Sequence, residues 1–194
     1  MASLTKQAIV ASYLKLCAKK SPERITVRDI VDDCEINRNT FYYYFQDVYA
    51  LVEEVFLLWS ADFCEACEGG EDLREGLYSL AQRILSEKKA AINLMRAFDG
   101  AMLEDYWLRA TAELWVGWVE RRSSQNGVSR EAIRYVAYTC AIAFLGILRR
   151  WIRDGMKVEP HALTERFCAV WLCDIDGALL RYEANRLKER EDGR

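Results

Sequence analysis

The sequence predicts an all-α fold, and three observations support this prediction. The chain of 194 residues contains only two prolines, Pro22 and Pro160, and each stands just before a segment with helical spacing. No run alternates apolar and polar side chains with the period of a half-buried strand. Hydrophobic residues make up 52% of the chain, enough for the core of one domain or of a small domain joined to a larger one.

The first two helices are expected near the N-terminus. The first covers about residues 5–20, where apolar side chains mark one face (Ile9, Tyr13, Leu16 and Cys17). The second follows Thr26, whose hydroxyl is suited to accept a backbone N–H that the first turn would leave unpaired. Asp29 adds a negative charge to that turn, where the helix dipole favours it. Its apolar positions also have helical spacing (Val27, Ile30, Val31 and Cys34).

A tight turn and a third, short helix follow. Ile36 is a lone apolar residue placed to fill the angle between two helices, and Asn37 is suited to cap the next helix. That helix covers residues 38–45, with Phe41 and Phe45 on one face. Its other positions are polar or aromatic (Arg38, Asn39, Thr40, Tyr42, Tyr43 and Tyr44). Such side chains suit phosphate oxygens and base edges, although the tyrosines could instead pack against neighbouring helices.

The order of these residues resembles the TetR family of bacterial transcriptional regulators. The pattern Ile-Thr-Val-x-Asp-Ile-Val, a turn, and Asn-Arg-x-Thr-Phe-Tyr-Tyr-x-Phe lies within residues 5–56. The resemblance implies an N-terminal three-helix helix-turn-helix head that binds double-stranded DNA, and a C-terminal helical body for ligand binding and dimerisation. We place the head at residues 1–50 and the body at residues 51–194. The resemblance implies that the following residues face DNA: Thr26, Arg28, Arg38, Asn39, Thr40, Tyr42, Tyr43 and Tyr44.

The chain departs from the family pattern at two positions. Glu35 stands where the turn usually has glycine, and a side chain there costs about 1 kcal/mol if the backbone is left-handed. Val48 stands where the family often has lysine at the start of the next helix, and valine cannot contact phosphate. These departures leave a second hypothesis open: the protein is a co-regulator or adaptor that acts through protein contacts and binds DNA weakly.

The remaining chain is expected to form the helical body. Asp47 caps a long helix that continues toward Cys67 and ends at Gly69-Gly70. Further helices are expected over about residues 71–88, 90–98, 104–122, 129–153 and from Pro160 to about Tyr182. The charged tail after residue 182 is expected to fray.

Aromatic residues of the body are candidates for the lining of an effector pocket. We expect a small-molecule effector, of unidentified chemistry, to bind among Phe98, Met102, Trp107, Trp115 and Trp118. The alternative is that these side chains simply fill the core. The resemblance supplies the expectation of a pocket, because bodies of this family commonly contain one.

The last two helices are the candidates for a homodimer interface. They are apolar on more than one side, which indicates a second partner. The resemblance implies that they form a four-helix bundle between two copies. The candidate interface residues are Tyr138, Ala141, Leu145, Gly146, Leu148, Trp171, Asp174, Gly177 and Ala178. The run Leu148–Met156 also resembles a C-terminal region found in many TetR-like regulators, some of them linked to dihydroxyacetone-kinase operons.

Composition argues against several other classes of protein. The seven cysteines are read as buried hydrophobes, and one histidine, His161, with a single CxxC at Cys64 and Cys67 favours no metal site and no cofactor. No catalytic motif is recognised, so no enzyme is expected. No signal-peptide core and no uncharged membrane-length stretch occur, which predicts a cytoplasmic protein. The net charge of −3, with +1 in residues 1–50 (seven basic minus six acidic), lends DNA binding little support.

The sequence therefore predicts a DNA-binding transcriptional regulator. The expected mode is a homodimeric repressor on a pseudo-palindromic operator, with an effector in the body that shifts the spacing of the two heads and weakens binding.

Overall fold

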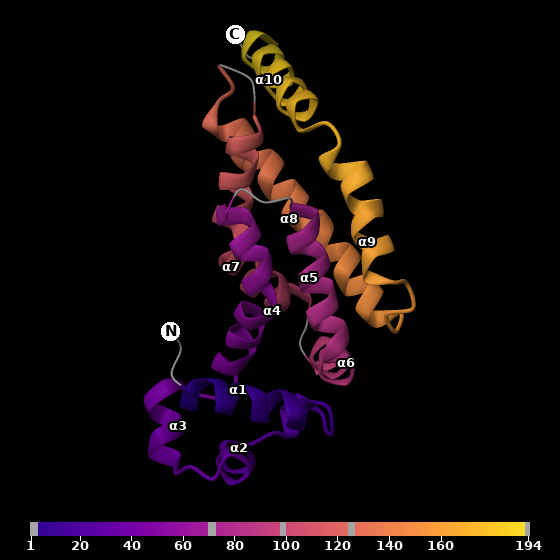
Figure 1. The fold of residues 1–194 in the computed structure, drawn as a ribbon. Helices are drawn as coiled ribbons and strands as arrows, with labels where there is room; N and C mark the ends of the chain where they lie inside the picture. The colour runs from indigo at the N-terminus through magenta and orange to yellow at the C-terminus, as the bar shows by residue number, and fades with distance from the viewer. Residues whose placement is uncertain (1–3, 70–72, 98–99, 124–126, 193–194) are drawn as a thin grey trace.

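The computed structural model describes residues 4–69, 73–97, 100–123 and 127–192. Within these ranges all regular secondary structure is helical, as predicted. Figure 1 shows a small unit of short helices at one end and a taller bundle rising from it. The helices are α1 (Leu4–Cys17), α2 (Val27–Cys34), α3 (Arg38–Tyr44), α4 (Ala50–Gly69), α5 (Leu73–Ser86), α6 (Lys88–Ala97), α7 (Gly100–Arg122), α8 (Arg130–Arg153), α9 (Pro160–Phe167) and α10 (Ile175–Asp192), with a 3₁₀ turn at Pro22–Arg24 and a π-helical turn at Cys168–Leu172.

The small unit is built from α1, α2, α3 and the first turns of α4. Its fully buried side chains come from all four helices: Ile9 and Tyr13, Ile30, Phe41, and Leu51. Asp47 accepts a hydrogen bond from the backbone N–H of Ala50 at 2.9 Å, and so caps α4 as predicted. The domain boundary expected after residue 50 falls in the first turn of α4, whose length carries the chain from the small unit into the bundle (Figure 1).

The body is organised around an aromatic cluster centred on Trp115 of α7. The Trp115 ring lies 5.4 Å from Phe63 of α4, 6.5 Å from Phe144 of α8 and 6.3 Å from Phe167 of α9, measured between ring centroids. All four side chains are fully buried. The cluster therefore joins four helices that are far apart in the sequence.

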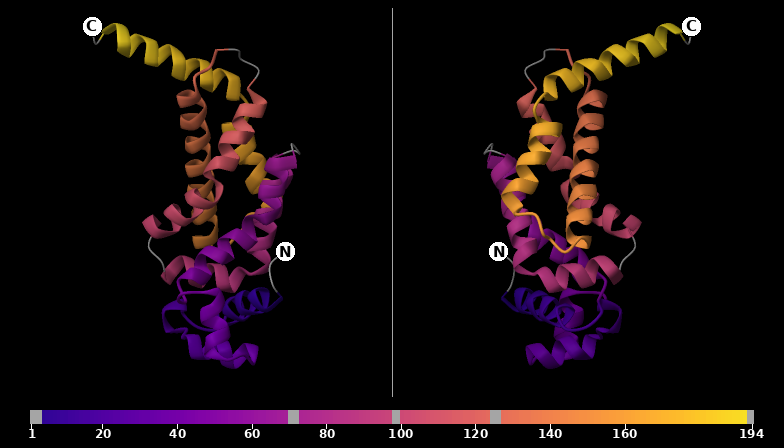
Figure 2. Two further views of the ribbon diagram at one scale, coloured as in Figure 1. Left: turned by 90° about the vertical axis from the view of Figure 1, so that its left-hand side faces the viewer. Right: turned by 90° about the vertical axis from the view of Figure 1, so that its right-hand side faces the viewer.

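The expectation of one continuous last helix with a frayed end was wrong. The chain instead forms α9, a π-helical turn and α10, and α10 remains helical to Asp192. Figure 2 shows α10 turning away from α9, so that its C-terminal part stands clear of the bundle. The π-helical turn and the two turn residues after it, Cys173 and Asp174, separate α9 from α10 and interrupt the regular α-helix.

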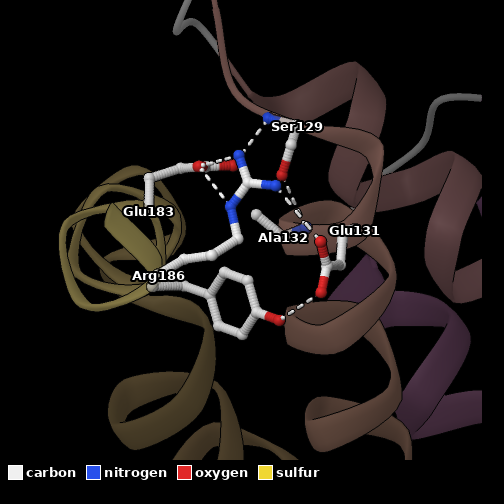
Figure 3. A network of polar contacts seen from close by, with 6 residues as sticks. Ser129, Glu131, Ala132, Glu183 and Arg186 are labelled. Atoms are coloured by element: carbon white, nitrogen blue, oxygen red, sulfur yellow. Dashed lines mark hydrogen bonds and ion pairs between the residues drawn. The ribbon is translucent and has the colours of Figure 1, made fainter. Parts of the chain in front are cut away.

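A polar network explains why α10 extends past Tyr182. Glu183 accepts a hydrogen bond from the backbone N–H of Ser129 at 2.8 Å, just before α8 (Figure 3). Arg186 bonds Glu183 at 2.8 Å and Glu131 at 3.2 Å, and the Tyr182 hydroxyl donates to Glu131 at 3.3 Å. Glu183 and Arg186 lie in the segment that was expected to fray. Their contacts instead hold α10 against the start of α8.

The helix α8 is long and apolar enough to cross a membrane by length and composition alone. In its most apolar 18-residue window, however, 44% of the residues are buried inside the protein. It packs most extensively against α7 and carries buried side chains along most of its length. Its composition is therefore that of a central core helix.

Candidate nucleic-acid interface

The start of α2 is fixed by a reciprocal capping box. The backbone N–H of Thr26 donates to the Asp29 carboxylate at 2.8 Å, and the backbone N–H of Asp29 donates to the Thr26 hydroxyl at 3.2 Å. Lys20, which lies in the turn after α1, adds an ion pair with Asp29 at 2.9 Å. The capping role inferred for Thr26 is confirmed, and its side chain is committed to this network.

These contacts make the head sensitive to acid. Hydrogen bonds from Thr26 and Lys20 lower the pKa of Asp29 to about 2, from about 3.9 in an unfolded chain. A lowered folded-state pKa stabilises the fold fully above the unfolded value, and this stabilisation is lost as the pH falls from about 4 to about 2. We expect Asp29→Ala to reduce the free energy of unfolding near neutral pH, and the difference from wild type to shrink toward about pH 2. Urea titrations followed by circular dichroism measure this.

The matched control for that experiment is Asp32→Ala. Asp32 is another carboxylate of α2, and it meets Arg28 only at 3.5 Å, with both side chains mostly exposed. We expect its removal to have a small effect, because exposed ion pairs contribute at most about 1 kcal/mol. An equal and equally pH-dependent loss in both variants would contradict the role given to the capping box.

The turn between α2 and α3 has the left-handed backbone that glycine would favour. Glu35 adopts φ 56° and ψ 37°, and its N–H bonds the carbonyl of Val31. The strain of a side chain in this region is of the order of 1 kcal/mol, as expected from the missing glycine. The next residue, Ile36, is half-buried, and its backbone N–H donates to the same Val31 carbonyl at 3.1 Å. The turn therefore keeps the geometry of a helix-turn-helix despite its unusual residue.

The short helix α3 is held by one capping residue and two buried rings. The Asn37 side chain accepts a hydrogen bond from the backbone N–H of Thr40 at 2.9 Å and another from the Thr40 hydroxyl at 3.2 Å. Phe41 and Phe45 are buried and lie 5.9 Å apart between ring centroids. These contacts fix which side of α3 faces the core and which side faces outward.

The outward side of α3 carries most of the residues predicted to face DNA. Tyr43 is 82% exposed and Tyr42 is 55% exposed, which excludes the alternative that these rings fill the core. Tyr44 is half-buried, and its ring meets that of Tyr43 edge-on at 4.9 Å. Arg38 and Asn39 are exposed. Thr40 is half-buried and shares the cap of α3, so its hydroxyl is partly committed.

Most cations of the head are paired with its own carboxylates. Lys6 bonds Glu54 at 2.6 Å, and Lys15 bonds Asp33 at 2.6 Å, in addition to the pairs of Lys20 and Arg28 described above. Within the described residues, Lys19, Arg24 and Arg38 have no ion-pair partner. The field at the head is therefore weak, and Arg38 is the unpaired cation on α3 itself.

Sequence reasoning missed one exposed aromatic residue of this surface. Tyr49 is 56% exposed and directly precedes α4, next to the half-buried Val48. The signal in the sequence is its phase, because it lies outside the apolar spacing of Leu51, Val52 and Val55. Tyr49 therefore places a hydroxyl near the start of α4, close to where the usual lysine is absent.

The predicted dimer residues fall into two groups in the structure. Ala141, Leu145 and Leu148 are buried within the chain, so their side chains belong to its own core. The others are exposed or half-buried: Tyr138, Gly146, Trp171, Asp174, Gly177 and Ala178. The bare Cα of Gly177 leaves room for the Asp174 carboxylate, which accepts the N–H of Gly177 at 2.9 Å and caps α10.

The predicted effector-pocket residues are only partly described. Phe98 lies outside the described residues, and the side chains of Met102 and Trp107 are not among those described. Trp115 and Trp118 are buried in the core, with ring centroids 6.4 Å apart. The buried indole N–H groups of Trp59 and Trp115 have no hydrogen-bond partner in the described part of the chain.

Comparison with protein families matches two parts of the chain. Residues 9–55 match the model described as bacterial regulatory proteins of the tetR family. Residues 71–171 match the model of a transcriptional regulator C-terminal region found with that family, and this is more than half of the chain. A comparison with curated proteins found no match.

Three solved structures with a similar fold are named as an operon activator, a degradation regulator and a repressor. The dihydroxyacetone kinase operon activator DhaS is 21% identical with a TM-score of 0.65, over 89% of this chain and 96% of the other. The fatty acid degradation regulator FadR from Bacillus halodurans is 14% identical with a TM-score of 0.66, over 89% and 97%. NalD, the secondary repressor of the MexAB-OprM multidrug efflux pump in Pseudomonas aeruginosa, is 18% identical with a TM-score of 0.55, over 87% and 93%. With its helix-turn-helix head and both family models matched, the chain belongs to the TetR family of DNA-binding transcriptional regulators.

Proposed function

We propose that the protein is a homodimeric repressor that binds a pseudo-palindromic operator through α3. The observation that supports this most is the outward face of α3, where Arg38, Tyr42 and Tyr43 are exposed while Phe41 and Phe45 hold the helix to the core. A helix held in this way presents its polar side to the major groove. In this assignment Tyr42 and Thr40 contact phosphate, and Arg38 and Tyr43 face bases.

The proposed dimer uses the face formed by α8 and α10. Large apolar side chains remain exposed on and around these helices: Tyr135, Tyr138, Val170, Trp171, Leu180 and Leu187. A hollow of about 580 Å³ lies between the two helices and is bordered by Trp171 and Tyr135. Apolar surface of this extent supports association with a second copy, which would also bring a second α3 to the operator.

The proposed control of binding is a small-molecule effector in the body. The buried indole N–H groups of Trp59 and Trp115 support this, because they have no hydrogen-bond partner among the described residues, and such buried donors are costly unless something accepts from them. An effector that prefers one spacing of the two heads would shift the population toward it and weaken operator binding. The protein would act in the cytoplasm, where both DNA and metabolites are within reach.

A second candidate function is a co-regulator that acts through protein contacts and binds DNA weakly. Four of the seven cations of the head are paired with carboxylates, and Val48 occupies the usual place of a lysine. With about two cationic phosphate contacts per head, the slope of log K against log salt would be about −3.6, shallow for a dimer. This slope measures how much of the binding is electrostatic.

Substitutions on α3 test the operator proposal. We expect Tyr43→Ala to relax specificity by about 1–3 kcal/mol at one base position, because a base contact is lost. Tyr42→Ala should weaken binding to all sequences alike, because a phosphate contact carries no sequence information. Fluorescence anisotropy with DNA from upstream of the protein's own gene, and with single-base variants of it, separates the two effects.

The control for this experiment is Tyr43→Phe, which keeps the ring and removes only the hydroxyl. If both alanine variants bind the upstream DNA as tightly and as selectively as wild type, the assignment of α3 is wrong. If wild type itself shows no preference for that DNA over random duplex, the result favours the co-regulator function over operator binding.

A further inference from the structure

A concave pocket between α6 and α8 gathers four arginines. It encloses about 420 Å³, and its charged lining consists of Arg96 from α6 and Arg149, Arg150 and Arg153 from α8. Ile92 contributes an apolar part of the lining. This concentration of positive charge is a local exception, because residues 51–194 carry 20 basic and 24 acidic side chains, a net charge of −4.

The charges of the pocket are only partly neutralised by the protein. Arg150 bonds Asp154 at 2.6 Å, and Arg149 takes part in a further interaction of its own. Neither Arg96 nor Arg153 has an ion-pair partner in the described part of the chain. Both side chains are exposed, so their guanidinium groups are available to a ligand.

Helix dipoles do not account for the whole cluster. Arg96 stands in the last turn of α6, and Arg150 and Arg153 in the last turn of α8, where cations are favourable. Each helix end is equivalent to roughly −0.5 charge. Arg150 is neutralised by Asp154, and Arg96 and Arg153 alone supply two positive charges, of which the two helix ends offset roughly one. The pocket therefore keeps a net positive charge, which favours an anionic ligand.

We propose that this pocket binds a small phosphorylated metabolite. Guanidinium groups present planar pairs of donors that match the oxygens of a phosphoryl group, which favours arginine over lysine in such sites. The apolar part of the lining, with Ile92, would receive the uncharged part of the ligand. Gly146 borders the same pocket, and apart from its own helix backbone no described atom lies within 4 Å of where its Cβ would stand, which leaves that space open.

The position of the pocket disfavours two other occupants. Figure 1 shows α6 on the body side of α1, whereas α2 and α3 lie on the opposite side, so DNA held by α3 would not adjoin the pocket. A second copy of the chain would bring the same arginines, and like charges facing each other are unfavourable. A small anion need not be held by α3, and its negative charge is attracted to the arginines, so neither argument applies to it.

The pocket adjoins a contact between the body and the head. Asn93 of α6 lies between pocket residues Ile92 and Arg96 in the sequence, and its amide donates to the backbone carbonyl of Cys17 at the end of α1 at 2.8 Å. An anion that fixes α6 against α8 would therefore restrain α1 as well. Hydrogen exchange at the end of α1 should slow when the anion binds, and Asn93→Ala should abolish this slowing without abolishing binding.

The test uses the full chain and inorganic pyrophosphate as the probe, followed by isothermal titration calorimetry without DNA. Sodium chloride at matched ionic strength supplies the baseline. We expect one saturable site per protomer, and weakening by about tenfold or more in both Arg96→Gln and Arg153→Gln, because each loses charge-assisted hydrogen bonds. Arg166→Gln is the matched control, since Arg166 is an exposed arginine of α9 outside the pocket.

Several results would overturn the proposal. These are absence of saturable pyrophosphate binding in the wild type, unchanged binding in both pocket variants, or an equal loss in Arg166→Gln. A further arm uses random duplex DNA. If the pocket variants lose duplex affinity as strongly as pyrophosphate affinity, the arginines serve DNA and not a metabolite. Because the calorimetry contains no operator, its failure leaves the proposed regulatory function untouched.

Discussion

Trp171→Glu and Tyr138→Glu are each expected to convert the protein into monomers and to abolish operator binding, although the head is unchanged. Trp171 is 41% exposed and Tyr138 is 49% exposed on the α8 and α10 face. In a two-fold interface each substitution occurs twice, and each buried, unpaired carboxylate costs roughly 3 kcal/mol. The dimer would be weakened by about 10⁴-fold. Sedimentation velocity at micromolar protein, with anisotropy on upstream DNA, measures both effects.

The control for the dimer experiment is Leu57→Glu on α4, an exposed apolar residue (42%) away from the α8 and α10 face. It should sediment as wild type does. Leu145 is unsuitable for this test because it is buried in the protomer's own core, and Gly177→Glu would also disturb the Asp174 cap of α10. A wild type that sediments as a monomer, or glutamate variants that remain dimers, would overturn the interface.

Trp115→Ala should destabilise the body by about 3–5 kcal/mol, the usual cost of removing a large buried aromatic ring. The ring touches Phe63, Phe144 and Phe167 from three other helices, so its loss leaves a cavity at the point where the bundle is joined. Urea unfolding monitored by circular dichroism measures the change in free energy. This loss is a large fraction of the total stability of an ordinary domain.

A milder substitution tests the reason for that loss. Trp115→Phe keeps most of the ring and removes the indole N–H, which lacks a partner in the described residues. Its cost should be well below that of alanine, because no unpaired donor stays buried. If phenylalanine costs as much as alanine, the indole N–H makes an important interaction and the packing argument fails.

The head was predictable from sequence because its signals are local. Thr26 and Asn37 stand at helix starts where their side chains accept specific backbone N–H groups, and both cap as expected. Phe41 and Phe45 lie four residues apart, which fixed the buried side of α3 and therefore its exposed side. The usual glycine at the position of Glu35 also indicated a left-handed backbone, and Glu35 has that backbone in the structure.

The body was harder to predict because its decisive contacts are distant in sequence. The extension of α10 depends on Glu183 and Arg186 meeting Ser129 and Glu131, more than fifty residues away. Apolar spacing marks Leu145 as buried but does not say whether its own chain or a partner buries it. The pocket between α6 and α8 likewise needs Arg96 and Arg153 brought together by the fold.

Hydroxyl-radical footprinting on DNA from upstream of the protein's own gene tests the central claim most directly. Two α3 helices held by a two-fold dimer should protect two patches on one face of the duplex, with centres about 10–10.5 base pairs apart or a multiple of that spacing. Trp171→Glu should remove both patches together. A single protected patch in the wild type, or no protection beyond that of random DNA, would contradict operator binding by a dimer through α3.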